Sequence, residues 1–510
     1  MNAITSALVK FSFIKGFVFC DMKISIIGAG IGGLSAACLL ARKGHSVTIF
    51  ERNDNVGGKM NQIQTDEFRF DTGPSLFTMP YILDELYLQC GTSIEQELEL
   101  EPLDINCRYF FQDGTIFNNY TDLNLTLDEI SNFAPNDVGA FLQFLDYAED
   151  LSHKTTPAFV RNPLYDFSDL KDLNFFSFLG IDAFTTVSKR VDKTFESDKL
   201  RQFFKRFATY NGSSPYQAPA TLNVIPHIEL GEGGYYVKGG LYKIAESLLN
   251  LASSLGVQFL YNAHVEKINI SDGSVSSVEL TNGEIVISDL VIANSDATET
   301  ISKLLKAHLP EKKLQASKRI EPSCSGFVLM LGIDTKYEQL IHHNIFFSDD
   351  YKREFDQIFV DKVMPDDPTI YIANTSYSDD GHAPNGGSNL FILVNAPYLS
   401  EHYDWEYYEE VYTKLVIKTL ERRGLHHLSE HIVYKKCITP LDFYQKYRSN
   451  KGSIYGTSSN SKMAAFVRPR NKFRGIEGLY MVGGSTHPGG GIPLSIQSAL
   501  NAVELIDRYE

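Results

Sequence analysis

Three glycines near the start of the chain have the spacing that binds the pyrophosphate of a dinucleotide. Gly28, Gly30 and Gly33 fit the pattern G-x-G-x-x-G. In this pattern the first glycine permits a tight turn, the second lets the backbone approach the pyrophosphate, and the third lets a helix pack on a strand. Glu51 follows near the ~20-residue offset expected of an acid that hydrogen-bonds a ribose hydroxyl. The alternative is a glycine-rich turn in some other α/β sheet.

Two further segments place glycine where the chain must pass the same cofactor again. One is a glycine doublet directly after Glu51, and the other is a short strand that ends in a Gly-Pro turn, since Gly-Pro continues neither a ladder nor a helix. The candidate cofactor-binding residues in these segments are Arg52, Gly57, Gly58, Lys59, Gly73, Pro74 and Ser75.

A third glycine loop lies close to the C-terminus, between a predicted strand and a predicted helix. Its candidate cofactor-binding residues are Gly483, Gly484, Gly491, Ile492 and Pro493. Pro493 suits the first turn of a helix, and a helix N-terminus can stabilise negative charge on a bound cofactor. His487 in this loop is the one candidate catalytic residue, because an imidazole can accept or relay a proton near neutral pH. The alternative is that His487 only shapes the loop.

The elements around these loops predict an α/β protein with a discontinuous cofactor domain. Residues 23–27 and 46–50 read as strands flanking a helix, and residues 289–294 read as a buried strand. Glycines open and close an amphipathic helix near residues 241–256. Several strands within residues 320–440 suit a second sheet, which would form a substrate domain.

Composition excludes several classes of function. The 510 residues suggest two or three domains. A net charge of -16 without a basic stripe excludes nucleic acid as a partner. The six cysteines show no C-x-x-C spacing, and H-E-x-x-H, a serine nucleophile elbow and a P-loop lysine are absent, so we predict no metal site. The 34 Phe and 27 Tyr furnish cores or line a long apolar pocket.

Two apolar stretches could contact a membrane. Residues 1–21 are apolar but interrupted by Lys10 and Lys15, so they are too short and too charged to span a bilayer. We interpret them as an extension upstream of a natural start at Met22, with a weak membrane-surface anchor as the alternative. The aromatic cluster at residues 173–179 could face a substrate tunnel or a lipid surface, or belong to an ordinary core.

The motifs at residues 22–59, 69–80, 107–110 and 483–493 resemble those of the bacterial-type carotenoid desaturases. The resemblance covers nearly everything after Met22. It implies FAD as the cofactor, because nicotinamide enzymes generally lack the Gly57-Gly58 doublet. It also implies that Val265 lies beside the adenine. The substrate would be a long acyclic carotenoid that loses a hydride to the flavin and a proton from the neighbouring carbon.

Within that family the C-terminal motif looks more like the hydroxycarotenoid 3,4-desaturase branch than phytoene desaturase. We therefore predict a 3,4-desaturase, with phytoene desaturase, carotenoid isomerase and amine oxidase as alternatives on the same fold. A binding protein without enzymatic activity, like the GDP-dissociation inhibitors, ranks last, because the cofactor glycines are intact. Oxygen or a quinone would accept the electrons.

The resemblance also predicts how the chain is divided and where it works. An FAD-binding domain would comprise residues 22–90, 235–320 and 440–510. Residues 91–234 and 321–439 would form an α+β substrate domain with a mixed sheet and a helical, membrane-facing region. We expect a cytoplasmic protein peripherally associated with the inner membrane, because carotenoids reside in lipid.

Overall fold

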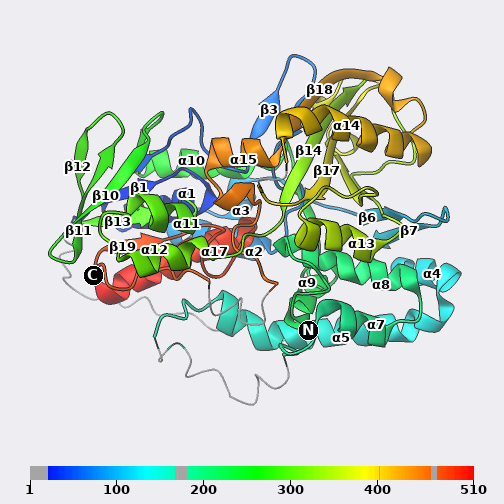
Figure 1. The fold of residues 1–510 in the computed structure, drawn as a ribbon, viewed down its shortest axis with the longest axis horizontal. Helices are drawn as coiled ribbons and strands as arrows, with labels where there is room; N and C mark the ends of the chain where they lie inside the picture. Colours follow the sequence, from blue (N-terminus) through cyan, green and yellow to red (C-terminus); the bar gives the residue numbers. More distant parts are fainter. Residues whose placement is uncertain (1–20, 167–168, 170–180, 401–402, 461–467) are drawn as a thin grey trace, which may run out of the picture.

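A five-stranded parallel sheet carries the first glycine loop at one end of the molecule (Figure 1). The computed structural model describes residues 21–166, 169, 181–400, 403–460 and 468–510. In spatial order the strands are β19 (Leu479–Met481), β13 (Leu290–Ala293), β1 (Lys23–Ile27), β2 (Ser46–Phe50) and β9 (Gln258–Leu260). Residues far apart in the sequence thus build one sheet, as the α/β prediction requires.

Both faces of this sheet are covered, as parallel sheets require. One face packs against α1 (Ile31–Arg42), α10 (Tyr242–Ser254) and α17 (Ile492–Tyr509), whose apolar stripes share one core. The other face packs against an antiparallel sheet of three strands. Its strands are β10 (Val265–Ser271), β11 (Ser274–Leu280) and β12 (Ile285–Ile287).

A mixed seven-stranded sheet forms the second part of the molecule (Figure 1). Its strands in spatial order are β18 (Ile432–Ile438), β14 (Ser325–Ile333), β17 (Ser388–Ala396), β16 (Ile370–Asn374), β15 (His343–Phe346), β6 (Ile105–Phe110) and β7 (Ile116–Tyr120). Only the β15–β6 pair is parallel. β6 and β7 form an antiparallel hairpin, and this sheet is the predicted mixed sheet.

Helices cover both faces of the second sheet. One core joins it to α14 (Trp405–Arg422), and another joins it to a helical layer rich in phenylalanine. The helices of that layer are α4 (Leu123–Phe133), α5 (Val138–Thr155), α7 (Val187–Thr194), α8 (Asp198–Lys205) and α13 (Tyr351–Asp356). The aromatic residues of the chain therefore furnish a large core, one of the two roles predicted for them.

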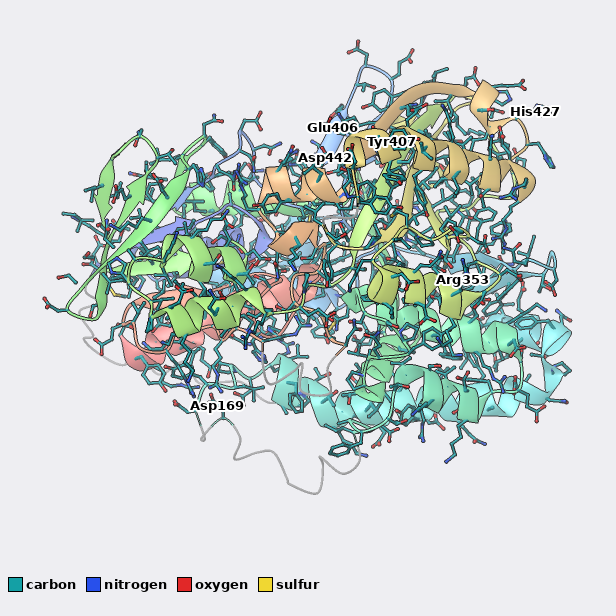
Figure 2. The ribbon with its side chains drawn as sticks, viewed as in Figure 1. Asp169, Arg353, Glu406, Tyr407, His427 and Asp442 are labelled. Carbon is teal, nitrogen blue, oxygen red and sulfur yellow. The ribbon has the colours of Figure 1, made fainter. Side chains whose placement is uncertain are left out.

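Short elements connect the two parts. The connecting strands form two antiparallel pairs, β3 (Gln62–Gln64) with β4 (Arg69–Asp71) and β5 (Leu100–Pro102) with β8 (Tyr235–Val237). The remaining helices are α2 (Pro80–Cys90), α3 (Ile94–Glu97), α9 (Val224–Pro226), α11 (Ala297–Glu299), α12 (Glu311–Lys318) and α15 (Pro440–Tyr447). A capping box starts α15, since Asp442 accepts from the Thr439 amide at 2.7 Å (Figure 2).

The ion pair of Arg69 and Asp71 ties β4 to the start of α10. Both side chains are buried, and the guanidinium donates two hydrogen bonds to the carboxylate, at 2.6 and 2.7 Å. The same carboxylate accepts from the amides of Leu241 and Tyr242, each at 3.0 Å. Asp71 therefore has a structural role.

Residues 1–20 of the predicted extension and the aromatic cluster at 173–179 lie outside the described residues. Within the described part of the chain, no helix is long and apolar enough to cross a membrane. The same part contains no group of three or more histidine, cysteine or acidic side chains that could hold a metal ion.

Removing the Asp71 carboxylate is expected to destabilise the protein strongly. Asp71→Ala leaves the buried Arg69 charge uncompensated, which costs about 3–5 kcal/mol of unfolding free energy. Chemical unfolding of the purified protein measures the loss. Asp66→Ala, in the exposed turn between β3 and β4, is the matched control and is expected to unfold like the wild type. Equal unfolding midpoints for the two variants would contradict the structural role of Asp71.

Candidate functional site

One cavity of about 680 Å³ brings the three glycine loops together. Every residue that the sequence singled out lines it, His487 and Val265 included, with the exception of Gly33. Gly33 has the packing role predicted for the third glycine, because a Cβ there would lie 2.2 Å from the Gly28 carbonyl oxygen. The cavity extends from the parallel sheet to β15 and β16 of the second sheet, so both parts of the fold contribute to it.

The first two glycine loops contact each other through backbone. The Gly57 amide donates to the Ala29 carbonyl at 2.9 Å. A Cβ on Gly58 would lie 3.2 Å from the Cα of Gly30, and one on Gly57 would lie 2.1 Å from the Met60 carbonyl oxygen. Gly57 also has φ +98°, a conformation that side chains other than glycine rarely adopt. Glycine is therefore required here for close backbone approach, as the sequence pattern indicated.

Asn294, which the sequence analysis did not single out as a site residue, joins the first loop to the third. It follows β13, and its side-chain amide donates to the Gly28 carbonyl at 3.1 Å. A Cβ on Gly30 would lie 2.9 Å from the Asn294 amide nitrogen, and one on Gly483 would lie 2.5 Å from its amide oxygen. Its position at the end of a buried strand beside the glycine loop was the only signal in the sequence.

Two helix N-termini border the cavity without any side chain to cap them. The N-cap residues are Gly30 for α1 and Gly491 for α17, and neither first turn contains an acidic residue. The first amides of a helix have no partner within the helix and carry the positive end of its dipole. Both termini are therefore suited to bind phosphate or another negatively charged group of a cofactor.

Glu51 lies at the end of β2 and is buried in the cavity wall. Its carboxylate accepts from the Ala29 amide at 2.7 Å and from the Asn53 amide at 2.8 Å. These bonds fix the carboxylate beside the first glycine loop and leave lone pairs on both oxygens. The ribose contact predicted for Glu51 stays a prediction.

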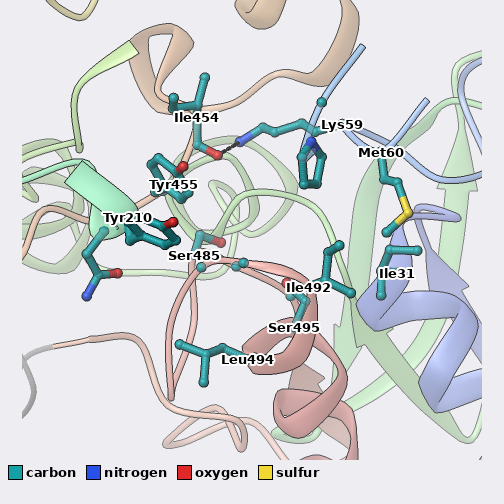
Figure 3. A pocket seen from close by; sticks show the side chains of 18 of the residues that line it. Ile31, Lys59, Met60, Tyr210, Ile454, Tyr455, Ser485, Ile492, Leu494 and Ser495 are labelled. Atoms are coloured by element: carbon teal, nitrogen blue, oxygen red, sulfur yellow. Dashed lines mark hydrogen bonds between the residues drawn. The ribbon is translucent and has the colours of Figure 1, made fainter. Parts of the chain in front are cut away.

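Two basic side chains that the sequence predicted lie in the same cavity without a strong ionic partner. Lys59 donates to the carbonyl oxygens of Ser453 at 2.9 Å and Ile454 at 3.1 Å, and Figure 3 shows the second bond. Burial lowers the pKa of Lys59 to about 8, although Asp296 opposes the shift. Burial, and then the charge of Arg448, lowers the pKa of Arg52. In the part of the chain that the structure describes, its Nη1 has no hydrogen-bond partner.

Arg468 is a third cation that lines the cavity, and sequence reasoning missed it. Its Nη2 donates to Ser459 at 2.7 Å, whereas its Nη1 has no hydrogen-bond partner among the described residues. Burial lowers the pKa of Arg468 to about 10, and no carboxylate of the described residues pairs with it. A Cβ on Gly489 would lie 3.2 Å from Nη1, so this charge faces the third glycine loop. Nothing in the local sequence distinguishes this arginine.

His487 is buried in the third loop and adopts a single tautomer. Its Nε2 lies 2.8 Å from the Asn162 carbonyl oxygen, which can only accept, so Nε2 carries the proton. Burial lowers the pKa of His487 to about 4, while the carbonyl opposes the shift. The imidazole is therefore neutral and weakly basic near pH 7. This state favours a loop-shaping role, and the catalytic role stays a prediction.

A family model described as flavin containing amine oxidoreductase matches residues 31–507. The chain belongs to this family of flavoproteins. A 4,4'-diapolycopene oxygenase of Methylomonas sp is 38% identical over 93% of the chain and 96% of that protein. A 4,4'-diaponeurosporene oxygenase of Staphylococcus haemolyticus is 36% identical over 96% of the chain and 97% of that protein. The predicted relationship to bacterial carotenoid-modifying flavoproteins is confirmed.

Solved structures show the same fold. An oxidoreductase from Methanosarcina mazei aligns with a TM-score of 0.66 at 16% identity, covering 95% of the chain and all of that protein. Putrescine oxidase bound to putrescine aligns at 0.62 with 14% identity, covering 96% of the chain and 99% of the oxidase. At these identities the likeness concerns the fold alone, and it confirms the predicted α/β class.

This flavoprotein is an oxidoreductase with FAD as its cofactor, and the cavity fits that group. The glycines leave room that a Cβ would fill, and two uncapped helix ends border the cavity. The first loop and α1 would hold the pyrophosphate, and the third loop with Arg468 would hold the flavin end. FAD supplies the redox chemistry when bound. The protein contributes binding, orientation and exclusion of water.

Filling the first loop is expected to abolish FAD binding. In Gly30→Val the new side chain meets the Asn294 amide and blocks the approach of backbone to the pyrophosphate. The purified variant should lose the flavin absorption band that the wild type shows. Gly139→Val, at an exposed helical glycine with open space around it, is the matched control and should stay yellow. A yellow Gly30→Val protein would contradict this placement of the cofactor.

Burial of neutral His487 is expected to make the protein less stable in acid. Between about pH 6.5 and pH 4 the unfolded chain protonates this histidine and the folded protein does not, so stability falls as the pH falls. Below about pH 4, the loss of unfolding free energy caused by this histidine reaches about 3 kcal/mol. Between about pH 6.5 and pH 4, the unfolding free energy of His487→Gln should change less than that of the wild type. Chemical unfolding at the two pH values measures this difference. His427→Gln, at an exposed side chain (Figure 2), should keep the dependence of the wild type.

Proposed function

We propose that this flavoprotein oxygenates an acyclic carotenoid at its terminal 4-position. The observation that carries the proposal is the pair of relatives named oxygenases of 4,4'-diapolycopene and 4,4'-diaponeurosporene, which align over nearly the whole chain. Their alignments cover 93% and 96% of the chain.

The walls of the cavity are suited to a long apolar substrate. Away from the glycine loops, they consist largely of aliphatic and aromatic side chains from the helical layer and the second sheet. Representative wall residues are Leu222, Ile225, Ile228, Ile345, Phe391 and Leu393. Such walls bind a rigid polyene through apolar contact and exclude water from the flavin.

The desaturase predicted from the sequence is the second candidate. Its support is the resemblance of the motif at residues 483–493 to hydroxycarotenoid 3,4-desaturases, whereas the relatives reported above carry oxygenase names. Both reactions need an apolar cavity against a flavin, so the geometry alone does not separate them. We rank oxygenation first because it rests on identity over the whole chain.

The proposed location of the protein in the cell follows from the solubility of the proposed substrate in lipid. A carotenoid dissolves in lipid, so we propose peripheral association of a cytoplasmic protein with the inner membrane. Oxygen would be consumed in an oxygenation, and oxygen or a quinone would reoxidise the flavin after a desaturation.

We also retain the proposed division into an FAD-binding domain of residues 22–90, 235–320 and 440–510 and a substrate domain of residues 91–234 and 321–439.

Product mass distinguishes the reactions. The FAD-loaded protein is incubated with 4,4'-diapolycopene or 4,4'-diaponeurosporene in liposomes under isotope-labelled oxygen gas. We expect a product that gains labelled oxygen at the end of the chain. Loss of two hydrogens without oxygen would support the 3,4-desaturase instead, and an unchanged mass with a shifted spectrum would indicate an isomerase.

Control incubations complete this test. A protein without flavin, prepared as Gly30→Val, should give no product. Peroxide release with an amine such as putrescine, and no change in either carotenoid, would identify an amine oxidase and overturn the proposal.

A further inference from the structure

A buried polar cluster interrupts the apolar wall of the cavity at its far end from α1. Arg206 and Tyr210 lie on a short helical segment after α8, and Glu229 lies on a helical turn that follows α9. Arg206 Nη2 pairs with Glu229 at 2.6 Å, and its Nη1 donates to the Tyr210 hydroxyl at 3.2 Å. The Tyr210 hydroxyl also donates to Glu229. All three side chains line the cavity.

A second line of polar groups reaches the same part of the cavity from the second sheet. The His343 Nδ1 on β15 lies 2.8 Å from the Tyr371 hydroxyl on β16, and that hydroxyl lies 2.5 Å from the Ser75 hydroxyl. Ser75 belongs to the Gly73-Pro74 turn, so this line starts beside the cofactor loops. Arg206, His343 and Tyr371 all line this one cavity, so both polar groups border the same space.

Two polar atoms of this cluster have no hydrogen-bond partner in the described structure. They are the Arg206 Nε and the His343 Nε2, on side chains only 7% and 2% exposed. A buried polar atom without a partner costs free energy, so such atoms indicate a place for a ligand. Burial lowers the pKa of His343 well below its usual value, so the imidazole is neutral. When Nδ1 accepts from Tyr371, Nε2 carries the proton and is free to donate.

We propose that this cluster is a polar subsite for an oxygen atom on the end of the carotenoid, in the form of a terminal hydroxyl or aldehyde. The inference rests on the proposed function and adds that the protein binds substrates already oxygenated at one end. Arg206 and His343 donate to the oxygen, and the apolar wall holds the polyene. A carboxylate fits less well, because Glu229 already neutralises Arg206.

The test is a binding measurement without turnover. The FAD-loaded protein is kept free of oxygen and titrated with 4,4'-diapolycopene, with its terminal monoalcohol and with its terminal monoaldehyde, each followed by the shift of polyene absorption. We expect the wild type to bind the aldehyde and the alcohol at least about ten-fold more tightly than the hydrocarbon, since hydrogen bonds to buried donors discriminate by about that factor.

Two variants act on the proposed His343 contact while keeping an aromatic ring: one removes the imidazole, and the other removes the hydroxyl that orients it. His343→Phe should reduce the preference to about three-fold or less, and Tyr371→Phe should weaken it by releasing the His343 ring. Binding of the hydrocarbon should stay within about two-fold of the wild type in both, as expected when only a polar contact is lost. Flavin content and unfolding midpoint of each variant show that it has folded.

Two neighbours serve as matched controls. His342→Phe changes the adjacent buried histidine, and Tyr109→Phe changes a buried tyrosine beside the Arg206 guanidinium; neither lines the cavity. Both variants should retain the preference of the wild type. Equal binding of hydrocarbon and aldehyde by the wild type would overturn the inference, and so would an equal loss of preference in these controls.

The inference and the proposed function fail separately in these experiments. A protein that oxygenates the hydrocarbon but binds all three polyenes equally would have the proposed function without the polar subsite. A protein that prefers the alcohol and aldehyde but adds no oxygen to any polyene would have the subsite without the proposed function.

Discussion

The structure depends on close contact between backbone segments around Asn294. Gly28, Gly32 and Gly483 approach one side-chain amide from two directions, and any Cβ on Gly32 would lie 2.8 Å from its oxygen and from the Gly483 nitrogen. Such a close approach is possible only because these residues are glycines, which have no Cβ. This contact holds the first and third glycine loops, which lie more than 400 residues apart in the sequence, at one cavity.

The charges in the cavity differ from those of the whole protein. The chain carries a net charge of -16, whereas Lys59, Arg52 and Arg468 face the cavity with few or no acidic partners. Isolated buried cations are costly unless a ligand supplies complementary charge or hydrogen-bond acceptors. FAD carries a pyrophosphate and accepts electrons, so it fits a site where helix N-termini and buried cations converge.

The cavity wall has two chemically different regions, one suited to the FAD cofactor and the other to the proposed polyene substrate. Near α1 and α17 its wall is backbone and glycine, which recognise phosphate and a planar ring through hydrogen bonds. Toward β15 and β16 its wall is apolar, except for the polar cluster that contains Arg206, Glu229 and His343. Apolar surface supplies affinity for a polyene, and the few polar groups supply orientation, as in other sites for apolar ligands.

The sequence by itself determined the local elements and the glycine positions of the site. Short apolar runs between turn signals, as at residues 23–27 and 289–294, predict buried strands. G-x-G-x-x-G obeys a local steric rule that needs no knowledge of the rest of the fold. The hairpin at Asp113-Gly114 and the start of α17 near Pro493 were predictable for the same reason.

Only the tertiary structure decided which distant side chains meet. Asn294, Arg468 and the pair of Arg206 and Glu229 carry no local signature, because their roles arise from segments that are separated in the sequence and joined by the packing of the two sheets. The state of His487 was also decided there: its residue type suggested a base near neutral pH, but burial and the Asn162 carbonyl make it a neutral donor. Desolvation depends on the whole fold, and a motif does not encode it.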